Sequence, residues 1–243
     1  MVDIVCKNVQ FTNIQAIIFD KDGTLEDSEA YIRSLGQKRS RLIDAQIPGT
    51  GEPLLMAFGI NGDKLDPTGL LAVASRYESQ IAAAAYIAET GRGWLEALEI
   101  ARHAFAEADK AIGTTASPLF VGSLEVLKYL SEAGLKLGIL SAASTARVRN
   151  FVQTHQLDDY IQLQMGVNAG GLSKPDPALF IQACQNLGVE PRHTLMVGDS
   201  IGDIEMARSA GAAGCIGIYW HQTAAHLRSA DVVISHLEEI KLL

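Results

Sequence analysis

The sequence contains 243 residues, with 20 lysines and arginines against 28 aspartates and glutamates, so the formal net charge is −8 with histidine neutral. Hydrophobic residues make up 48% of the chain and charged residues 20%, which excludes a largely disordered chain. The acidic balance disfavours general binding to nucleic acid or to an anionic membrane surface. We therefore expect a folded protein of one large domain or two smaller ones.

The cysteines and the N-terminal residues bear on the cellular location. Cys6, Cys184 and Cys215 lie far apart without a C-x-x-C pair, so neither a disulfide framework nor a zinc knuckle is indicated. The N-terminal run MVDIVCKNVQ lacks the uninterrupted apolar segment of a signal peptide. The most apolar helical stretch, residues 81–88, is too short to span a bilayer. We expect a soluble cytoplasmic protein with no membrane or nucleic-acid partner.

Short apolar runs that stop at charged or polar residues recur along the chain. The first covers residues 14–20 (IQAIIFD) and is typical of a buried parallel strand. Further strands are predicted at residues 135–141, 193–199, 213–219 and 231–234. Helical patterns are found at residues 123–134, 145–157 and 177–188. This alternation predicts an α/β fold with a doubly wound, mainly parallel sheet.

Residues 28–113 interrupt the alternation. They carry helical patterns at residues 29–46, 69–89 and 93–112, separated by Gly/Pro-rich turns, and no good strand. The simplest interpretation is an inserted all-helical domain, and the alternative is one long crossover packed on the sheet. We predict an α/β core from residues 1–25 and 116–243, and a helical insertion at residues 26–115. Residues 47–69 are long and glycine-rich enough to form a specificity loop.

Two aspartates follow the first predicted strand in the run FDKDGTLED. Asp20 and Asp22 stand two residues apart where the strand ends, which is the edge at which open α/β sheets bind ligands. Because side chains alternate along an extended segment, both carboxylates are expected on one side and Lys21 on the other. Gly23 permits a tight turn with exposed backbone N–H groups, a natural contact for an anion.

A second acidic pair lies in the run LMVGDSIGDIEMARSAG. Asp199 ends a predicted strand, and Asp203 follows four residues later as a helix begins. Either residue alone is explained as an ordinary helix cap. If both meet Asp20 and Asp22 at one sheet edge, mutual repulsion raises the pKa values of the carboxyls unless a cation neutralises them. Oxygen ligands of this kind favour Mg²⁺.

Two further residues supply hydrogen-bond donors and positive charge. Ser141 ends a predicted strand and offers its hydroxyl with the amides of Ala142 and Ala143. Lys174 precedes a proline in the run GGLSKPDP, so we expect it on an extended loop from which its side chain reaches back. Alone, Ser141 would be interpreted as a strand-end or helix-cap serine and Lys174 as a surface lysine. Only their order along the chain and their combination with the aspartates indicate a functional site.

In chain order, FDKDGTL, the strand ending at Ser141, the loop with Lys174 and GDSIGD resemble the four motifs of the haloacid dehalogenase superfamily of phosphohydrolases. The resemblance covers residues 14–25 and 119–243, and the helical insertion stands where this superfamily carries a cap domain. The segment SADVVISHLEEI is similar to the end of the phosphoglycolate-phosphatase-like branch. The resemblance implies a Rossmann-like core with an inserted helical cap.

The resemblance implies a reaction and a metal site. Asp20 would attack phosphorus and form an aspartyl-phosphate, while Asp22 would protonate the leaving group and later accept a proton from water. Asp20, the backbone carbonyl of Asp22 and Asp199 would hold Mg²⁺. Asp203 would orient Lys174 or a metal-bound water.

The resemblance also implies a phosphate-binding set. Ser141 and Lys174 would bind the phosphoryl oxygens and stabilise developing charge. Backbone amides at Gly23 and Ala142 would add contacts, and the Thr24 hydroxyl would support the motif turn. Ala142 departs from the many relatives that carry asparagine at this position, which bears on the identity of the substrate.

The expected substrate is a small phosphorylated metabolite, either a phosphoglycolate-like acid or a sugar phosphate. Asp22 argues against true dehalogenases and against the phosphonatase branch, which lack an acid there. Lys21 is expected to contact the cap or the far end of the substrate. Basic residues of the insertion are candidates for binding an acidic substrate: Arg33, Lys38, Arg39, Arg41 and Arg76.

Other functions fit parts of the same pattern. A phosphosugar mutase of the β-phosphoglucomutase type would keep the aspartates and return the phosphoryl group to its substrate. A receiver-like phosphoacceptor protein or a non-catalytic binding protein would also use this kind of scaffold, although the D-x-D-G-T block and the insertion speak against the former. A monomer or a homodimer is expected in each case.

Overall fold

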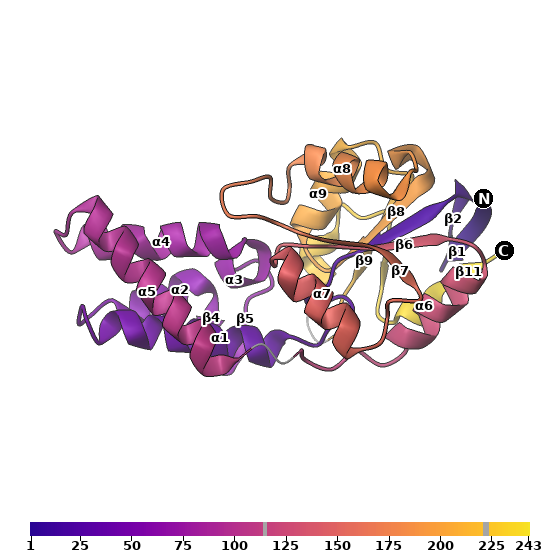
Figure 1. Ribbon diagram of the computed structural model, residues 1–243. Coiled ribbons are helices and arrows are strands. Elements are labelled where there is room, and N and C mark those ends of the chain that lie inside the picture. The colour runs from indigo at the N-terminus through magenta and orange to yellow at the C-terminus, as the bar shows by residue number, and fades with distance from the viewer. Residues whose placement is uncertain (114–115, 221–223) are drawn as a thin grey trace. The chain divides into compact units, whose positions relative to one another are not determined.

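The computed structural model describes residues 1–113, 116–220 and 224–243. The chain divides into two compact units. One consists of Met1–Asp27 together with Ala116–Leu243, and the other of Ser28–Thr115. The first is an α/β unit and the second is mainly helical (Figure 1).

A six-stranded sheet forms the centre of the α/β unit, and every neighbouring pair of its strands is parallel. The order is β10-β9-β8-β3-β6-β7. The strands are β3 (Ala16–Phe19), β6 (Lys136–Ser141), β7 (Ile161–Gly166), β8 (Thr194–Gly198), β9 (Gly214–Ile218) and β10 (Val232–Ile234). The predicted doubly wound parallel sheet is confirmed, and β3 lies at its centre between β6 and β8.

Helices cover both faces of this sheet (Figure 1). They are α6 (Ser123–Glu132) and α7 (Thr145–Thr154) on one face, and α8 (Pro177–Leu187) and α9 (Ile201–Ser209) on the other. Along β3, Ile17 and Phe19 pack into the core with α6 and α7, whereas Ala16 and Ile18 pack with α8 and α9. Because both faces are buried, the strand is a continuous apolar run, which is why the sequence reveals it.

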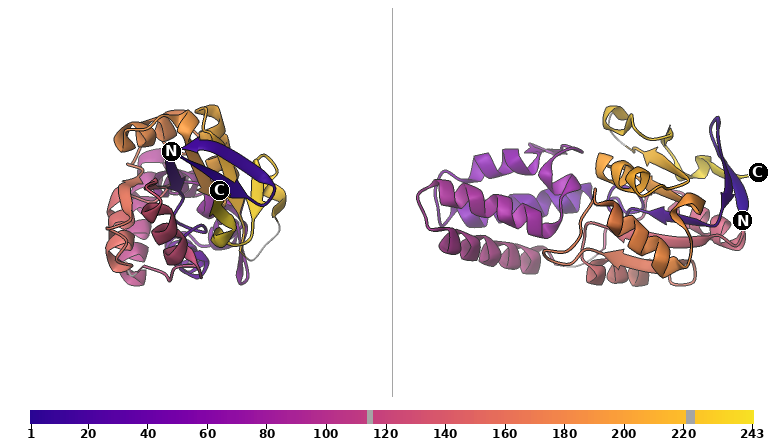
Figure 2. Two further views of the ribbon diagram at one scale, coloured as in Figure 1. Left: turned by 90° about the vertical axis from the view of Figure 1, so that its right-hand side faces the viewer. Right: turned by 90° about the horizontal axis from the view of Figure 1, so that it is seen from above.

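A second sheet joins the two ends of the chain. Its three strands are β1 (Val2–Cys6), β2 (Val9–Ile14) and β11 (Ile240–Leu242), in the antiparallel order β11-β1-β2. Figures 1 and 2 show the N- and C-termini next to each other at this sheet. Sequence patterns did not predict these strands or β7, because their residues are only partly buried and do not form the apolar runs of central strands.

Between residues 28 and 113, the described part of the second unit, the chain forms five helices and one short hairpin. The helices are α1 (Glu29–Asp44), α2 (Gly51–Phe58), α3 (Leu70–Val73), α4 (Arg76–Glu89) and α5 (Trp94–Ile112), and the hairpin joins β4 (Ile60–Asn61) to β5 (Lys64–Leu65). They share a core of small and large apolar side chains, including Phe58 and Phe105. The unit is helical as expected, apart from this hairpin of two-residue strands.

Two predictions of detail within this unit are wrong. Residues 47–69 are not a long loop, because they contain α2 and the β4–β5 hairpin. The helix predicted over residues 69–89 is divided, since Ala74 is extended and Ser75 is the N-cap of a new helix, α4. Ser75 and Glu78 form a reciprocal capping box there, which stops a continuous helix and satisfies the free N–H groups of the new one.

The segments that connect the two units pair with each other inside the α/β unit. Asp27 N donates to Pro118 O at 2.9 Å, and Phe120 N donates to Leu25 O at 3.0 Å. Glu26 forms an isolated antiparallel bridge with Leu119 between these two bonds. The chain therefore leaves and re-enters the α/β unit through one short ladder.

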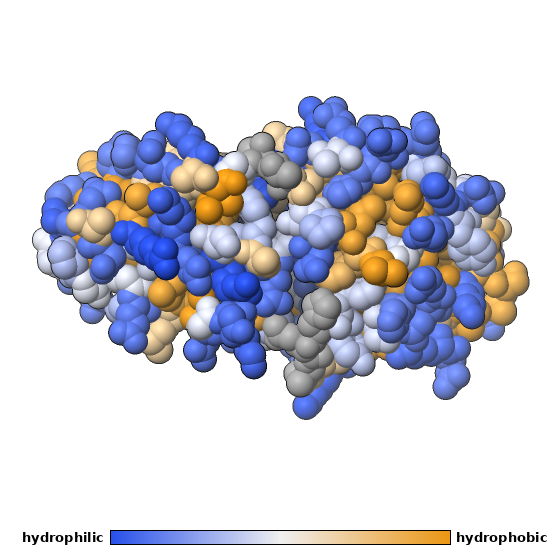
Figure 3. Space-filling model, turned by 90° about the horizontal axis from the view of Figure 1, so that it is seen from below, coloured by the Kyte–Doolittle hydropathy of each residue, from blue (hydrophilic) through white to orange (hydrophobic). Residues whose placement is uncertain are grey.

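The surface combines hydrophilic residues with small groups of apolar ones, as the face in Figure 3 shows. All three cysteines are buried and free of disulfides. Among the described residues, none of the helices combines the length and the hydrophobicity needed to cross a membrane.

Candidate active site

The candidate site lies at the carboxyl edge of the six-stranded sheet. Asp20 directly follows β3, Asp199 directly follows β8, and Ser141 is the last residue of β6. Phe19 pairs in parallel register with Ile139 and Val197, so the three strands end at the same edge. This is the edge at which open parallel sheets bind their ligands.

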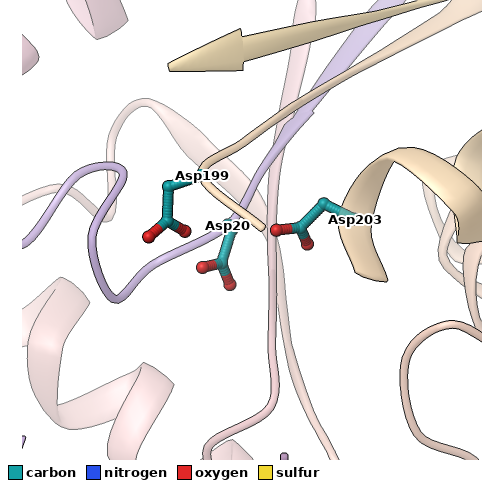
Figure 4. A group of neighbouring side chains, drawn as sticks. All are labelled: Asp20, Asp199 and Asp203. Carbon is teal, nitrogen blue, oxygen red and sulfur yellow. The ribbon is translucent and has the colours of Figure 1, made fainter. Parts of the chain in front are cut away.

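Three carboxylates converge at this edge. One oxygen from each of Asp20, Asp199 and Asp203 lies within 4.8 Å of the others. Figure 4 shows Asp199 and Asp203 on either side of Asp20, with Asp203 carried by α9. Asp20 and Asp203 are buried, so their negative charges are poorly screened by solvent. The structure thus brings together three of the four aspartates expected to meet.

Lys174 joins two of these carboxylates. Its Nζ lies 2.7 Å from Asp20 Oδ1 and 2.6 Å from Asp203 Oδ1, and the side chain is 5% exposed. The residue lies in a turn before α8, with a cis bond to Pro175. Burial lowers the pKa of the Lys174 ammonium, but the two carboxylates outweigh burial and hold its pKa above the ordinary value. Lys174 is therefore a permanent positive charge in the site.

Asp203 is held by the start of α9. Its Oδ2 accepts hydrogen bonds from the hydroxyl of Ser200 at 2.6 Å and from the Ser200 backbone N–H at 3.2 Å. Its own N–H donates to the Ser200 hydroxyl, which completes a capping box. A β-carbon at Gly198 would lie 2.5 Å from the Asp203 carboxyl carbon, so only glycine fits there. Sequence reasoning missed Ser200, although the S-x-x-D pattern was its signal.

Asp199 is positioned by the turn after β3. Gly23 has φ of +77°, and a β-carbon on it would lie 2.1 Å from Asp199 Oδ2. The Thr24 hydroxyl donates to Asp199 Oδ1 at 3.4 Å. The backbone carbonyl of Asp199 accepts a hydrogen bond from His226 Nε2 at 2.9 Å. No sequence pattern signalled this contact of His226.

Burial and mutual repulsion shift the proton affinities of these groups. Burial raises the pKa of Asp20 to about 7; Asp203 and Asp22 add to the shift, and Lys174 opposes it. Burial also raises the pKa of Asp199 well above its ordinary value, with further increases from Asp20 and Asp203. The cluster holds three carboxylates but one ammonium, which pairs with Asp20 and Asp203, so it carries an excess of negative charge that suits a divalent cation.

Ser141 and Ala142 lie where β6 ends. The buried Ser141 hydroxyl accepts a hydrogen bond from the Ala143 N–H at 3.0 Å, so it is ordered by its own loop. Ala142 is half-buried in the bend that follows. A β-carbon at Gly166 on the neighbouring strand would lie 2.3 Å from the Ala143 carbonyl oxygen, so this loop packs closely on β7.

Strand alternation predicted that the Lys21 side chain lies on the side opposite Asp22, but the two side chains are in contact. Lys21 is 1% exposed, and its Nζ lies 2.6 Å from Asp22 Oδ1. The same ammonium forms an ion pair with Glu26 and lies 5.5 Å from the ring centroid of Phe151. The prediction that Lys21 contacts the cap or the substrate is wrong, because these neighbours in the α/β unit enclose its charge.

The basic candidates in the helical unit are differently placed. Arg39 is buried, pairs with Asp109 at 3.0 Å and lies 4.2 Å from the ring centroid of Phe105. Arg76 contacts the same Asp109 at 2.8 Å. Arg33 donates to the Asp63 carbonyl at 2.5 Å, and on α1 Lys38 is half-buried and Arg41 exposed. Arg39 is therefore part of the internal packing of this unit.

The chain is similar to known proteins over nearly its whole length. A phosphoglycolate phosphatase of Yersinia pestis is 27% identical over 241 residues, which are 96% of this chain and 94% of that protein. An N-acetylmuramic acid 6-phosphate phosphatase of Pseudomonas putida is 26% identical over 231 residues, 94% of this chain and 95% of that one. The crystal structure of a predicted phosphoglycolate phosphatase from Haemophilus somnus 129pt has a TM-score of 0.68 at 23% identity, covering 93% of this chain and 96% of that chain.

A family model for haloacid dehalogenase-like hydrolases matches residues 14–211. That range includes the turn after β3, the end of β6, the Lys174 loop and the start of α9. The chain belongs to the haloacid dehalogenase-like hydrolases.

Proposed function

We propose that the protein is a Mg²⁺-dependent phosphatase that hydrolyses a small phosphorylated metabolite, a phosphoglycolate-like acid or a sugar phosphate. The observation that carries this proposal is the convergence of Asp20, Asp199 and Asp203 around Lys174 at the carboxyl edge of the sheet. The two phosphatases named above, which align with nearly the whole chain, support the same reaction class.

Asp20 is the proposed nucleophile. Its carboxylate would attack phosphorus in line and displace the leaving group, forming an aspartyl-phosphate that water then hydrolyses. Lys174 would hold the Asp20 oxygen and stabilise the charge on the phosphoryl oxygens, and Ser141 would donate a further hydrogen bond. The Ser200 cap on Asp203 supports the role of Asp203 in orienting Lys174.

Asp22 is the proposed acid and base. It would protonate the oxygen of the departing alcohol and later take a proton from the attacking water. Its position two residues after Asp20, in the turn that begins at the sheet edge, supports this role. The backbone amide of Ala142 remains a proposed contact for the phosphate, and Thr24 a proposed support for the turn. The expected contact from the Gly23 amide is not proposed again, because this N–H donates to the Glu26 carbonyl at 3.0 Å.

The donor set fits Mg²⁺. The carboxylates of Asp20 and Asp199, with the backbone carbonyl of Asp22, are the proposed ligands, whereas both oxygens of Asp203 already contact Lys174 and Ser200. The bound cation would neutralise the excess negative charge and polarise the phosphoryl group. Without it, the pKa of Asp20, raised to about 7, leaves this carboxyl partly protonated near neutral pH.

The helical unit is the proposed cap, and residues 1–25 and 116–243 the proposed catalytic core. As a cap, this unit would exclude water from the reaction and contact the leaving group. Since Arg39 is engaged internally, Arg33, Lys38, Arg41 and Arg76 are the remaining basic candidates for binding an acidic substrate. The proposed setting is the cytoplasm, with a monomer or homodimer acting on a small metabolite.

Phosphate release from purified protein tests the reaction class. A panel of phosphorylated acids, phosphorylated sugars and a generic aryl phosphate is assayed with Mg²⁺ and with EDTA. Asp20→Asn should abolish metal-dependent release. Asp176→Asn is the matched control, because asparagine also caps a helix well and Asp176 caps α8 outside the cluster. Retained release in Asp20→Asn would refute the proposed nucleophile.

The same assay separates the mutase alternative. Product analysis of each sugar phosphate would detect an isomerised phosphosugar formed with little free phosphate if the protein were a mutase. Phosphate released in proportion to substrate consumed supports the phosphatase. Absence of any turnover, with Mg²⁺ binding intact, would favour a receiver-like or non-catalytic role.

A further inference from the structure

A buried ion pair lies directly behind the proposed acid–base residue. Lys21 stands between Asp20 and Asp22 in the chain, yet its side chain is 1% exposed. Its Nζ contacts the carboxylates of Asp22, at 2.6 Å, and of Glu26. Burial lowers the pKa of Lys21, but Asp22 and Glu26 outweigh burial and raise its pKa above the ordinary value, so it stays charged.

The backbone brings these three residues together. The amides of Leu25 and Glu26 donate to the Lys21 carbonyl at 3.0 and 2.9 Å, and the Gly23 amide donates to the Glu26 carbonyl at 3.0 Å. The chain therefore turns back on itself between Lys21 and Glu26. The turn therefore holds the lysine at its start and the glutamate at its end within reach of each other.

Glu26 is itself firmly anchored. Its Oε1 accepts a hydrogen bond from the Ser117 N–H at 2.7 Å, while its other oxygen holds Lys21. Its backbone belongs to the ladder that pairs the two connecting segments. Phe151 of α7 packs near the ammonium of Lys21. Lys21 is thus held by Glu26 and packed near Phe151, in addition to its contact with Asp22.

We propose that Lys21, anchored by Glu26, is a positioning residue that holds one oxygen of the Asp22 carboxylate in place for proton transfer to the leaving group. This inference rests on the proposed phosphatase function. A general acid must stand within hydrogen-bond reach of the atom it protonates, and Asp22 is a quarter exposed on a surface turn. The contact with a buried, immobile ammonium restricts the orientations open to that carboxylate.

The leaving group provides a test that general loss of structure would not mimic. An aryl phosphate has a good leaving group and needs little protonation, whereas an alkyl phosphate depends on the acid. For Lys21→Met we expect kcat/KM for an alkyl phosphate to fall by about 10- to 100-fold, less than the roughly 100- to 10,000-fold contribution of a general acid, because Asp22 itself is retained. The value for p-nitrophenyl phosphate should fall much less.

A second variant separates positioning from stability. Lys21→Met alone leaves Glu26 buried without its cation, which destabilises the protein. Lys21→Met with Glu26→Gln removes both charges, and glutamine keeps the carbonyl that accepts from Ser117. The double variant should recover most of the lost stability in urea unfolding and still show the selective loss on the alkyl phosphate. Lys136→Met is the matched control, since Lys136 also donates from its Nζ to a fixed acceptor, the Leu187 carbonyl, away from the cluster.

The outcomes are distinct. An unchanged ratio of the two kcat/KM values in a folded double variant, or an equal loss on both substrates, would overturn the positioning role while the wild-type protein remains a phosphatase. If the wild-type protein releases no phosphate from either compound with Mg²⁺ present, the proposed function fails and the positioning role fails with it. A selective loss in both Lys21 variants, absent in Lys136→Met, supports the inference.

Discussion

Gly23 and Asp199 meet so closely that a β-carbon on Gly23 would stand 2.1 Å from Asp199 Oδ2. The two residues come from neighbouring strands, β3 and β8, and are far apart in the sequence. The turn after β3 thus leaves no room for a side chain beside a proposed metal ligand. Two separate properties of glycine are used here, its small size and its positive φ of +77°.

Gly23→Ala should displace the Asp199 carboxylate. We expect loss of Mg²⁺ binding in calorimetry and at least a 100-fold lower rate of phosphate release, since a proposed ligand would move. Gly211 has the same φ of +77°, and a β-carbon there would meet nothing within 4 Å. Gly211→Ala therefore carries only the backbone cost of about 1–2 kcal/mol. Equal loss of Mg²⁺ binding in both variants would show that contact with Asp199 is not the cause.

Lys174→Met removes the ammonium between Asp20 and Asp203. In EDTA at pH 8 we expect the free energy of unfolding to fall by about 3–5 kcal/mol, because buried carboxylates lose their partner. The loss should be smaller at pH 5, where Asp20, whose pKa is raised to about 7, takes up a proton. Urea unfolding measures both values. Lys110→Met, in an exposed pair with Glu107, should leave the midpoint unchanged, and a similar shift there would contradict the argument.

Asp20 should make the metal-free protein less stable as the pH rises. Its pKa is raised from 3.8 to about 7, chiefly by burial, so between these values the folded protein keeps a proton that the unfolded chain has released. This contribution to stability is complete below pH 3.8 and is lost as the pH rises through 7, with a slope of at most about 1.4 kcal/mol per pH unit. Asp20→Asn should show a flatter profile in urea unfolding with EDTA between pH 5 and 8. Parallel profiles for the two proteins would count against the raised pKa.

Arg39 and Arg76 share Asp109 but differ in burial. The side chain of Arg39 is 5% exposed and that of Arg76 is 46% exposed. Arg39→Met should therefore destabilise the helical unit by about 3–5 kcal/mol, and Arg76→Met by less than about 1 kcal/mol. Thermal and urea unfolding of the full chain measure the two. If the exposed arginine proved as costly as the buried one, the ranking by burial would be wrong.

The central strands and the carboxylate cluster were predictable for one physical reason. A strand covered on both faces is a continuous apolar run, and the acid that interrupts it marks the sheet edge. Asp20 and Asp199 stand at such interruptions, and the strands that they follow, β3 and β8, are neighbours in the parallel sheet. The position of these acidic residues at the edge of the sheet could therefore be predicted from where each apolar run ends.

Other features of the fold have no comparable pattern in the sequence. The edge strand β7 alternates buried and exposed residues only in part, and β1, β2 and β11 are short and partly polar. The path of Lys21 depends on a flexible side chain that turns toward Glu26, which strand alternation does not describe. The capping box at Ser75 divides a pattern that is helical on both sides.

The position of β3 constrains the order in which the chain folds. Its partners, β6 and β8, follow the helical unit in the sequence, and β1 pairs with β11 at the very end of the chain. Contacts of such long sequence separation form slowly, whereas those of α1 to α5 are local. We expect the helical unit to gain hydrogen-exchange protection first during refolding. The six-stranded sheet should be protected later, because β3 precedes the helical unit in the sequence and the other strands follow it.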